Sequence, residues 1–261
     1  MTPVETASVF PGGHTELIDP AVEQLHAVAE KHGVRIVGDD ATPDIAIVLG
    51  GDGTMLRALT RLRGTDVPVL GINYGRVGFL TAIAPYEMDA ALERVFAGDY
   101  SVIRLPTLEV EVGGETQVAV NDAVITSGTI GRIVELEYAL RDEKIGSQRC
   151  DGLVCATPQG STAYNLSNGG PVLVWGLDAM VLTFVAPHSL HVRPLVVARG
   201  PDLTVTNASP DIATTVIVDG HEVGSLAPGE KAVLRIGARD CLLATLPDVT
   251  FFTRYAAAFG R

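Results

Sequence analysis

The sequence predicts an α/β domain followed by a β-rich domain, and two patterns carry that prediction. Over the first hundred residues, short apolar runs alternate with segments whose apolar residues recur at helical spacing. Strands that alternate with helices are typical of a parallel sheet covered by helices. Beyond about residue 100, apolar and polar residues alternate around glycine turns, which is typical of antiparallel sheets. We therefore predict domains over residues 1–98 and 99–246.

Turn residues delimit the elements of the first domain. Asp19 and Pro20 are typical of a helix start, and Gly33, Gly64 and Gly98 are typical of helix ends. We expect helices from Asp19 to Gly33, over 54–63 and from Tyr86 to Ala97, and buried strands over 34–37, 45–50 and 67–73.

The second domain carries two hairpin signals. Gly113-Gly114 divides the alternating run 108–120, and Asp219-Gly220 divides 216–223. Further alternating runs that predict strands lie at 133–140, 196–206, 214–218 and 231–236.

Composition narrows the class of function. The 261-residue chain has a net charge of −12, and a field of that sign repels nucleic acid and anionic membranes. We therefore expect neither as a partner. Three cysteines without metal-ligand spacing indicate reduced thiols. No signal peptide and no bilayer-length apolar stretch is visible, so we expect a cytoplasmic protein.

The first chemical motif is "LGGDGTMLRA" at 49–58, where a buried strand meets a helix. Glycines let backbone N–H groups approach an anion, and a helix start adds positive potential. The lysine of a Walker A loop is absent. Asp52 is thus a carboxylate on a rigid turn, able to accept a hydroxyl proton or to help place Mg²⁺. The alternative is that Asp52 only caps the helix.

Two further stretches are rich in polar side chains. In "TPQGSTAYNLSNGGPV" at 157–172, several hydroxyl residues lead into a short helix and suit ribose and phosphate oxygens, although a simple Ser/Thr cap is the alternative. In "VNDAVI" at 120–125, Asn121 and Asp122 interrupt a strand pattern. Neighbours on a regular strand point to opposite faces, so the pair reaches one ligand only if the backbone bends. The alternative there is a plain turn.

Together these motifs resemble those of NAD kinases. The resemblance adds "PVLGINYGRVGFLT" at 68–81 and "APHSLHVRPLVV" at 186–197, and it extends over roughly residues 45–240. It implies the two-domain fold of that family, with the tail at 247–261 returning to the first domain. It also implies homo-oligomers, dimers or tetramers, in which Asp151 reaches a neighbour's site.

The implied reaction is phosphoryl transfer from ATP, or from polyphosphate, to the adenosine-ribose 2′-hydroxyl of NAD, with a divalent ion such as Mg²⁺. Asp52 matches the proton acceptor of the family, and no residue is assigned to the metal. The resemblance assigns NAD binding to Asp52, Gly53, Arg57, Asn121, Asp122, Arg132, Arg149, Asp151, Thr162, Ala163, Tyr164, Asn165, Leu166, Ser167 and His221.

Departures and alternatives accompany this prediction. Gln159 replaces the small hydroxyl residue usual in the family, and "FPGGHTEL" at 10–17 does not match its first loop. Diacylglycerol and sphingoid-lipid kinases share the GGDG turn, and a non-catalytic dinucleotide sensor is a third class. We expect NAD rather than a lipid because an acyl chain would leave the hydroxyls of 157–167 without hydrogen-bond partners.

Overall fold

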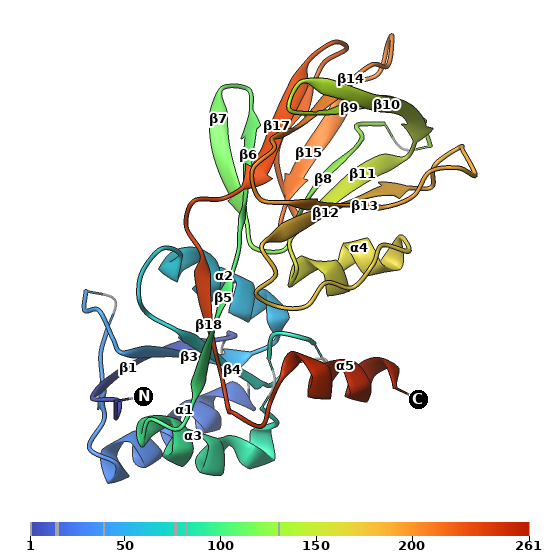
Figure 1. Cartoon of the computed structure of the whole chain (residues 1–261). Helices are drawn as coiled ribbons and strands as arrows, with labels where there is room; N and C mark the ends of the chain where they lie inside the picture. The colour runs from blue at the N-terminus through green and yellow to red at the C-terminus, as the bar shows by residue number, and fades with distance from the viewer. Residues whose placement is uncertain are drawn as a thin grey trace. The chain divides into compact units, whose positions relative to one another are not determined.

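The structure is a computed structural model, and it describes residues 2–13, 16–38, 40–75, 78–81, 83–129 and 131–260 (Figure 1). Parts of the predicted segments 10–17 and 68–81 lie outside these residues. The chain divides into two compact units, unit 1 (Met1–Arg104 with Cys241–Arg261) and unit 2 (Leu105–Asp240). These limits differ from the predicted 1–98 and 99–246, because strands at both joints belong to the sheet of unit 1.

Unit 1 is built on a six-stranded sheet of order β2-β1-β3-β4-β18-β5, in which β1, β2, β3, β4 and β18 pair in parallel. This confirms the predicted α/β class. The strands are β1 (Thr6–Pro11), β2 (Arg35–Ile36), β3 (Ile45–Gly50), β4 (Val69–Asn73), β5 (Ser101–Leu105) and β18 (Cys241–Thr245). The helices are α1 (Ile18–Lys31), α2 (Asp52–Leu62), η1 (Pro85–Glu87), α3 (Met88–Phe96) and α5 (Phe251–Phe259).

The sequence of each element explains its place in unit 1. Every residue of β3 is buried, as expected for a central strand covered on both faces. Helix α1 buries Ala21, Leu25 and Val28, which share one face, and packs beside α3. Figure 1 shows α1 and α3 on one face of the sheet and α2 on the other. The turn between β3 and α2 follows the last residue of β3, so it lies at the carboxyl ends of the parallel strands.

Unit 2 consists of two antiparallel sheets, of order β10-β9-β14-β17-β6-β7 and β13-β12-β11-β8-β15-β16. Side chains from both sheets form one core cluster, which confirms the predicted β-rich class. The elements are β6 (Leu108–Val112), β7 (Glu115–Ala119), β8 (Asp122–Ser127), β9 (Val134–Leu140), β10 (Glu143–Cys150), β11 (Gly152–Ala156), η2 (Gly160–Thr162), α4 (Tyr164–Ser167), β12 (Ala179–Val185), β13 (Leu195–Ala198), β14 (Leu203–Asn207), β15 (Thr214–Val218), β16 (His221–Leu226) and β17 (Lys231–Ile236).

Both predicted hairpins of unit 2 are confirmed. Gly113 and Gly114 have φ of 60° and 83° between β6 and β7, and Asp219 and Gly220 have φ of 47° and 82° between β15 and β16. The predicted strand run 196–206 is wrong as one element. It contains β13 and β14, which belong to different sheets, because the chain leaves one sheet at Ala198 and enters the other at Leu203.

The chain passes from one sheet of unit 2 to the other at two points that bear on function. It crosses between β7 and β8 at Val120 and Asn121, and between β10 and β11 at Asp151. A crossing bends the backbone, which is the condition under which Asn121 and Asp122 can serve one ligand.

Within the described part of the chain, no helix has the length and apolarity needed to cross a bilayer.

Candidate active site

Asp52 is the first residue of α2, and its carboxylate holds the loop that follows β4. Oδ2 accepts from the backbone N–H groups of Phe79 (2.9 Å) and Leu80 (3.5 Å). Oδ1 accepts from the backbone N–H (3.1 Å) and the hydroxyl (2.9 Å) of Thr81. A Cβ atom on Gly78 would lie 2.2 Å from Asp52 Oδ2, so only glycine lets the loop come this close. The carboxylate is therefore fixed in position by four hydrogen bonds.

The alternative role for Asp52, a helix cap, is wrong. Gly51 is the N-cap residue of α2, and no side-chain capping bond occurs there among the described atoms. Asp52 thus adds negative charge to the first helical turn and points toward the loop at 78–81. Gly53 and Arg57 are exposed on the same helix. Arg57 has a single weak contact, from Nη2 to Thr54 Oγ1 at 3.4 Å.

The C-terminal helix α5 holds the other side of the same loop. Arg254 Nη2 donates to the carbonyl oxygens of Gly78 and Thr81, and the guanidinium lies 6.0 Å from the ring centre of Phe79. The Phe79 ring also stacks on Phe259, with centroids 5.7 Å apart. Burial lowers the pKa of Arg254, and the charge of Asp52 opposes that shift. Asp52 and Arg254 therefore both bond to the loop at 78–81, Asp52 to its N–H groups and Arg254 to its carbonyl oxygens.

Asn121 and Asp122 lie at one end of the second sheet of unit 2. Asp122 begins β8, opposite Ala156 at the end of β11, and β15 ends alongside at Val218. The segment 157–167 and the turn with His221 follow β11 and β15, so both emerge at this end of the sheet. His221 is exposed, with Nδ1 3.1 Å from the carbonyl oxygen of Asp219. The structure thus brings together three of the predicted NAD-binding segments.

Asp122 is a buried carboxylate whose side chain is only 7% exposed. Burial raises its pKa to about 7, and the nearby carboxylate of Asp219 adds to the shift. Burial also raises the pKa of Asp219, but three backbone N–H groups and His221 oppose that change. Asp219 therefore has hydrogen-bond donors that oppose the effect of its burial, whereas Asp122 has none among the described groups.

Three hydroxyls of the 157–167 segment bond within the protein. Thr157 Oγ1 donates to the carbonyl oxygen of Val120 (2.7 Å), Ser161 Oγ to that of Pro158 (2.6 Å), and Thr162 Oγ1 to that of Gln159 (3.0 Å). These three hydroxyls have partners without any ligand. The predicted reason for preferring NAD over a lipid, that a lipid would leave them unsatisfied, is therefore wrong. The alternative of a simple Ser/Thr cap is also wrong, because η2 and α4 have Gln159 and Ala163 as N-cap residues.

Other predicted residues of this segment differ in their exposure. The Asn165 side chain is fully buried; Nδ2 donates to the carbonyl oxygens of Ser161 and Pro171, and Oδ1 accepts from Thr183. That side chain therefore stabilises the loop. The residues left at the surface are Thr162, Ala163, Tyr164, Leu166 and Ser167, with Tyr164 and Ser167 the more exposed.

Arg132, Arg149 and Asp151 form a second group near the opposite end of this sheet. Arg132 follows β8, Asp151 precedes β11, and Arg149 lies on β10 of the other sheet. Gly152, next to Asp151, pairs with Thr126, whereas Asp122 lies four residues earlier on β8. At about 3.3 Å per residue, the two ends are separated by roughly 13 Å along the strand. Both arginines line a cavity of about 480 Å³ whose other walls are Gly131, Ile133, Val134, Glu135, Ser209, Pro210, Asp211 and Ile212.

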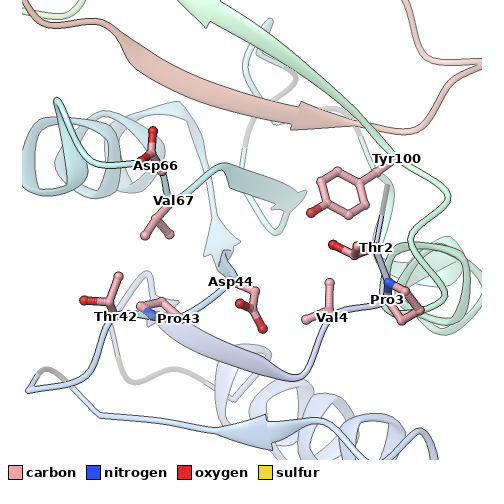
Figure 2. Close-up of a pocket in the computed structure, with 9 residues that line it drawn as sticks. All are labelled: Thr2, Pro3, Val4, Thr42, Pro43, Asp44, Asp66, Val67 and Tyr100. Atoms are coloured by element: carbon pink, nitrogen blue, oxygen red, sulfur yellow. The ribbon is translucent and has the colours of Figure 1, made fainter.

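Unit 1 has a cavity of about 310 Å³ that contains none of the predicted site residues. Figure 2 shows its walls, which are Thr2, Pro3, Val4, Thr42, Pro43, Asp44, Asp66, Val67 and Tyr100. These residues precede β1, β3, β4 and β5, so the cavity lies at the amino ends of the strands. Ligands of open α/β sheets bind at the carboxyl ends, where Asp52 lies.

No cluster of three or more His, Cys, Asp or Glu side chains in the described residues has the geometry to hold a metal ion. Mg²⁺ keeps several waters and is commonly bound through substrate phosphates and one or two carboxylates.

Comparison with known proteins gives the fold and the family. Residues 22–100 match the ATP-NAD kinase N-terminal domain, and 120–245 match the ATP-NAD kinase C-terminal domain. A crystal structure of an NAD kinase from Archaeoglobus fulgidus in complex with ATP is similar with a TM-score of 0.79 at 24% identity, over 98% of this chain and 97% of that one. Yeast NADH kinase complexed with NADH gives 0.86 at 19%, over 99% and 88%. The chain therefore has the fold of these dinucleotide kinases.

Relatives of closer sequence settle the family. The NAD kinase of Tolumonas auensis is 39% identical over 91% of this chain and 83% of its own length. That of Gemmatimonas aurantiaca is 37% identical over 91% and 84%. The chain belongs to the NAD kinase family.

Proposed function

We propose that this protein transfers the terminal phosphoryl group of ATP to the adenosine-ribose 2′-hydroxyl of NAD, which yields NADP. The observation that carries the proposal is the fixed carboxylate of Asp52 on the GGDG turn, in a chain that matches both domains of the NAD kinase family. Family membership selects this reaction over the lipid kinases that share the turn.

The proton acceptor in this proposal is Asp52. A ribose hydroxyl is a poor nucleophile at neutral pH, and a positioned base typically contributes about 10²–10⁴ in rate. As the 2′-oxygen forms its bond to phosphorus and the bond to the leaving ADP oxygen breaks, the hydroxyl proton passes to an Asp52 oxygen. The Leu80 N–H bond to Oδ2, at 3.5 Å, is the weakest of the four and is the one a hydroxyl can replace.

Charge neutralisation accompanies the proton transfer. Phosphoryl transfer depends on positioning and on balancing the charge spread over the phosphate oxygens. Arg57 is exposed on the helix that begins at Asp52 and supplies positive charge there. A divalent ion such as Mg²⁺, bound to the ATP phosphates, would supply further neutralisation.

Adenosine binding is assigned to Asn121 and Asp122, with the exposed part of 157–167 and His221 alongside. The ionised Asp122 carboxylate accepts hydrogen bonds from ribose hydroxyls, and these offset its burial. The same oxygens have no donor among the described side chains, so a ligand hydroxyl meets an open acceptor.

Arg132, Arg149 and Asp151 are assigned to NAD bound by another subunit. They lie roughly 13 Å along β8 from Asp122, too far to share one ribose with it. This separation supports a homo-oligomer, a dimer or tetramer, in which this group contacts a neighbour's nucleotide. A cytoplasmic location belongs to the same proposal.

The test is direct turnover with purified protein. NAD, diacylglycerol and sphingosine are each incubated with labelled ATP and Mg²⁺, and products are separated by chromatography. A parallel reaction replaces ATP by polyphosphate. We expect labelled NADP and no lipid phosphate; lipid phosphate without NADP would overturn the proposal.

A further inference from the structure

The Asp219 carboxylate binds the backbone of Val120–Asp122 through three hydrogen bonds. Oδ2 accepts from the N–H of Val120 (2.7 Å), and Oδ1 accepts from those of Asn121 (2.8 Å) and Asp122 (3.2 Å). The Asp219 N–H in turn donates to the carbonyl oxygen of Asp122 at 3.0 Å. One side chain from the β15–β16 turn thus satisfies every N–H group of the crossing segment.

The carbonyl groups of the same segment are held from the other side. Thr157 Oγ1 donates to the carbonyl oxygens of Val120 (2.7 Å) and Asn121 (3.1 Å), and the Thr157 N–H donates to that of Asn121 at 2.8 Å. Gln159 Nε2 donates to the Val120 carbonyl at 2.6 Å, and the Gln159 side chain is only 2% exposed. A Cβ on Gly160 would lie 2.0 Å from the backbone carbonyl oxygen of Asn121, so a side chain at position 160 would clash with this segment.

This arrangement has an electrostatic cost that a plain turn would avoid. Asp219 places a carboxylate beside the buried Asp122, and like charges in a poorly solvated site destabilise one another. Asn or Ser would also close a tight turn at this position without the second charge. The carboxylate, however, is the one side-chain group with two oxygens that both accept, which three converging N–H groups require.

We propose that Asp219 is a positioning residue for NAD binding, whose carboxylate sets the bend at Val120–Asp122 so that the Asn121 and Asp122 side chains face the adenosine ribose. This inference rests on the proposed function, because it names a residue that acts through the NAD-binding pair. Asp219 itself contacts the backbone and not the nucleotide.

The charge of Asp219 gives this role a signature beyond folding. Burial raises the pKa of Asp122, and the Asp219 carboxylate adds to that rise. Burial likewise raises the pKa of the Cys155 thiol, and Asp122 adds to it. The His221 imidazole also lies here, and it opposes the rise in the pKa of Asp219. Removing the Asp219 charge therefore makes Asp122 ionise at lower pH.

The experiment compares Asp219→Asn with Asp142→Asn in the full-length protein. Asp219 and Asp142 both lie in hairpin turns with positive φ, 47° and 64°, where Asn is tolerated. NAD affinity is measured by calorimetry from pH 5.5 to 8.5, and kcat at saturating NAD. For Asp219→Asn we expect NAD affinity at least tenfold weaker, kcat within about threefold of the wild type, and the pH midpoint of NAD binding moved to lower pH. Asp142→Asn should match the wild type in all three.

The outcomes separate this inference from the function on which it rests. If the wild-type protein neither binds nor phosphorylates NAD, the proposed function fails, and the inference with it. If the wild type is active and Asp219→Asn keeps native affinity and the native midpoint, only the positioning role is overturned. Weaker binding with an unmoved midpoint and a lowered melting temperature would also overturn it, because that result marks a merely structural side chain.

Discussion

Asp52 and Asp122 are two carboxylates in opposite surroundings. Asp52 accepts four hydrogen bonds from the loop at 79–81, in unit 1. Asp122, in unit 2, is buried beside a second carboxylate, and of the described groups none donates a hydrogen bond to its oxygens. Donors that surround a carboxylate fix its position, whereas a buried carboxylate without donors gains by meeting a ligand hydroxyl.

In the proposed reaction, this difference suits the two residues to different steps. Asp52 is held in place before substrate arrives, as a proton acceptor must be. Burial disfavours the charged form of Asp122 in the free protein, and in the proposed complex ribose hydroxyls would offset that cost by donating hydrogen bonds. Substitutions at the two positions should therefore separate turnover from affinity.

The largest effect is expected from Asp52→Asn. Loss of the proton acceptor should lower kcat by roughly 10² or more while NAD affinity stays near native. The measurement is kcat together with NAD affinity by calorimetry. Thr81→Val is the matched control, because it removes one donor to Asp52 and keeps the carboxylate; its kcat should fall no more than about fivefold. Native kcat in Asp52→Asn would refute the assignment as base.

Asp122→Ala should have the next largest effect, on binding. Removing a charged hydrogen-bond partner costs about 1.5–3 kcal/mol, which corresponds to roughly tenfold to over a hundredfold in NAD affinity. Affinity should also weaken in the wild type as the pH falls below about 7, because Asp122 then takes a proton. Native affinity in Asp122→Ala, with the fold retained by circular dichroism, would show that the pair is only a bend in the chain.

Asp122→Asn should make the free protein more stable above pH 7. The pKa of Asp122 is raised in the folded protein from 3.8 to about 7, so between these values the folded state keeps a proton that the unfolded state releases. The free energy of unfolding of the wild type therefore falls as the pH rises through this window. Asn removes that loss, by about 1–3 kcal/mol at pH 8.

Thermal unfolding checks this effect. The melting temperatures of the wild type and Asp122→Asn should be close at pH 4 and diverge by pH 8, with the variant higher. Equal melting temperatures at pH 8 would show that burial does not destabilise the charged form of Asp122.

Arg254→Ala should have the smallest effect of the set. It releases the carbonyl side of the loop at 78–81 but leaves the bonds to Asp52, so we expect kcat to fall by about three- to tenfold with little change in NAD affinity. The control is Arg63→Ala, at the far end of α2. A loss of NAD affinity larger than the loss of kcat would contradict the loop as the point of action.

Much of the fold was predictable because it rests on local patterns. Helical periodicity and short apolar runs gave the α/β class of unit 1, and the glycine pairs gave both hairpins. The predicted domain limits differ from the limits of the two units because β5 and β18 belong to the sheet of unit 1, where they pair with strands distant in sequence. The period of apolar residues carries no information about which sheet a strand joins, so the run 196–206 predicts no break where the chain changes sheets.

The site was predictable as motifs but not as contacts. The GGDG, Asn-Asp and TPQGSTAY stretches are visible as strings, and they supplied Asp52, Asn121 and Asp122. Asp219 and Arg254 act across about 100 and more than 170 residues of sequence, and neither stands in a motif that points to its partner. For Asp219 the only signal was an acidic residue in the Asp-Gly turn. The sequence likewise does not show that hydroxyls of 157–167 bond within the protein, because no motif points to their partners.

The decisive measurement is a paired determination of kcat and NAD dissociation constant for Asp52→Asn and Asp122→Asn at pH 8. The assignment predicts a crossed pattern, in which Asp52→Asn loses roughly 10² or more in kcat and keeps its affinity, while Asp122→Asn loses tenfold or more in affinity and keeps most of kcat. Parallel losses of both quantities in both variants would contradict the division of roles between the two carboxylates.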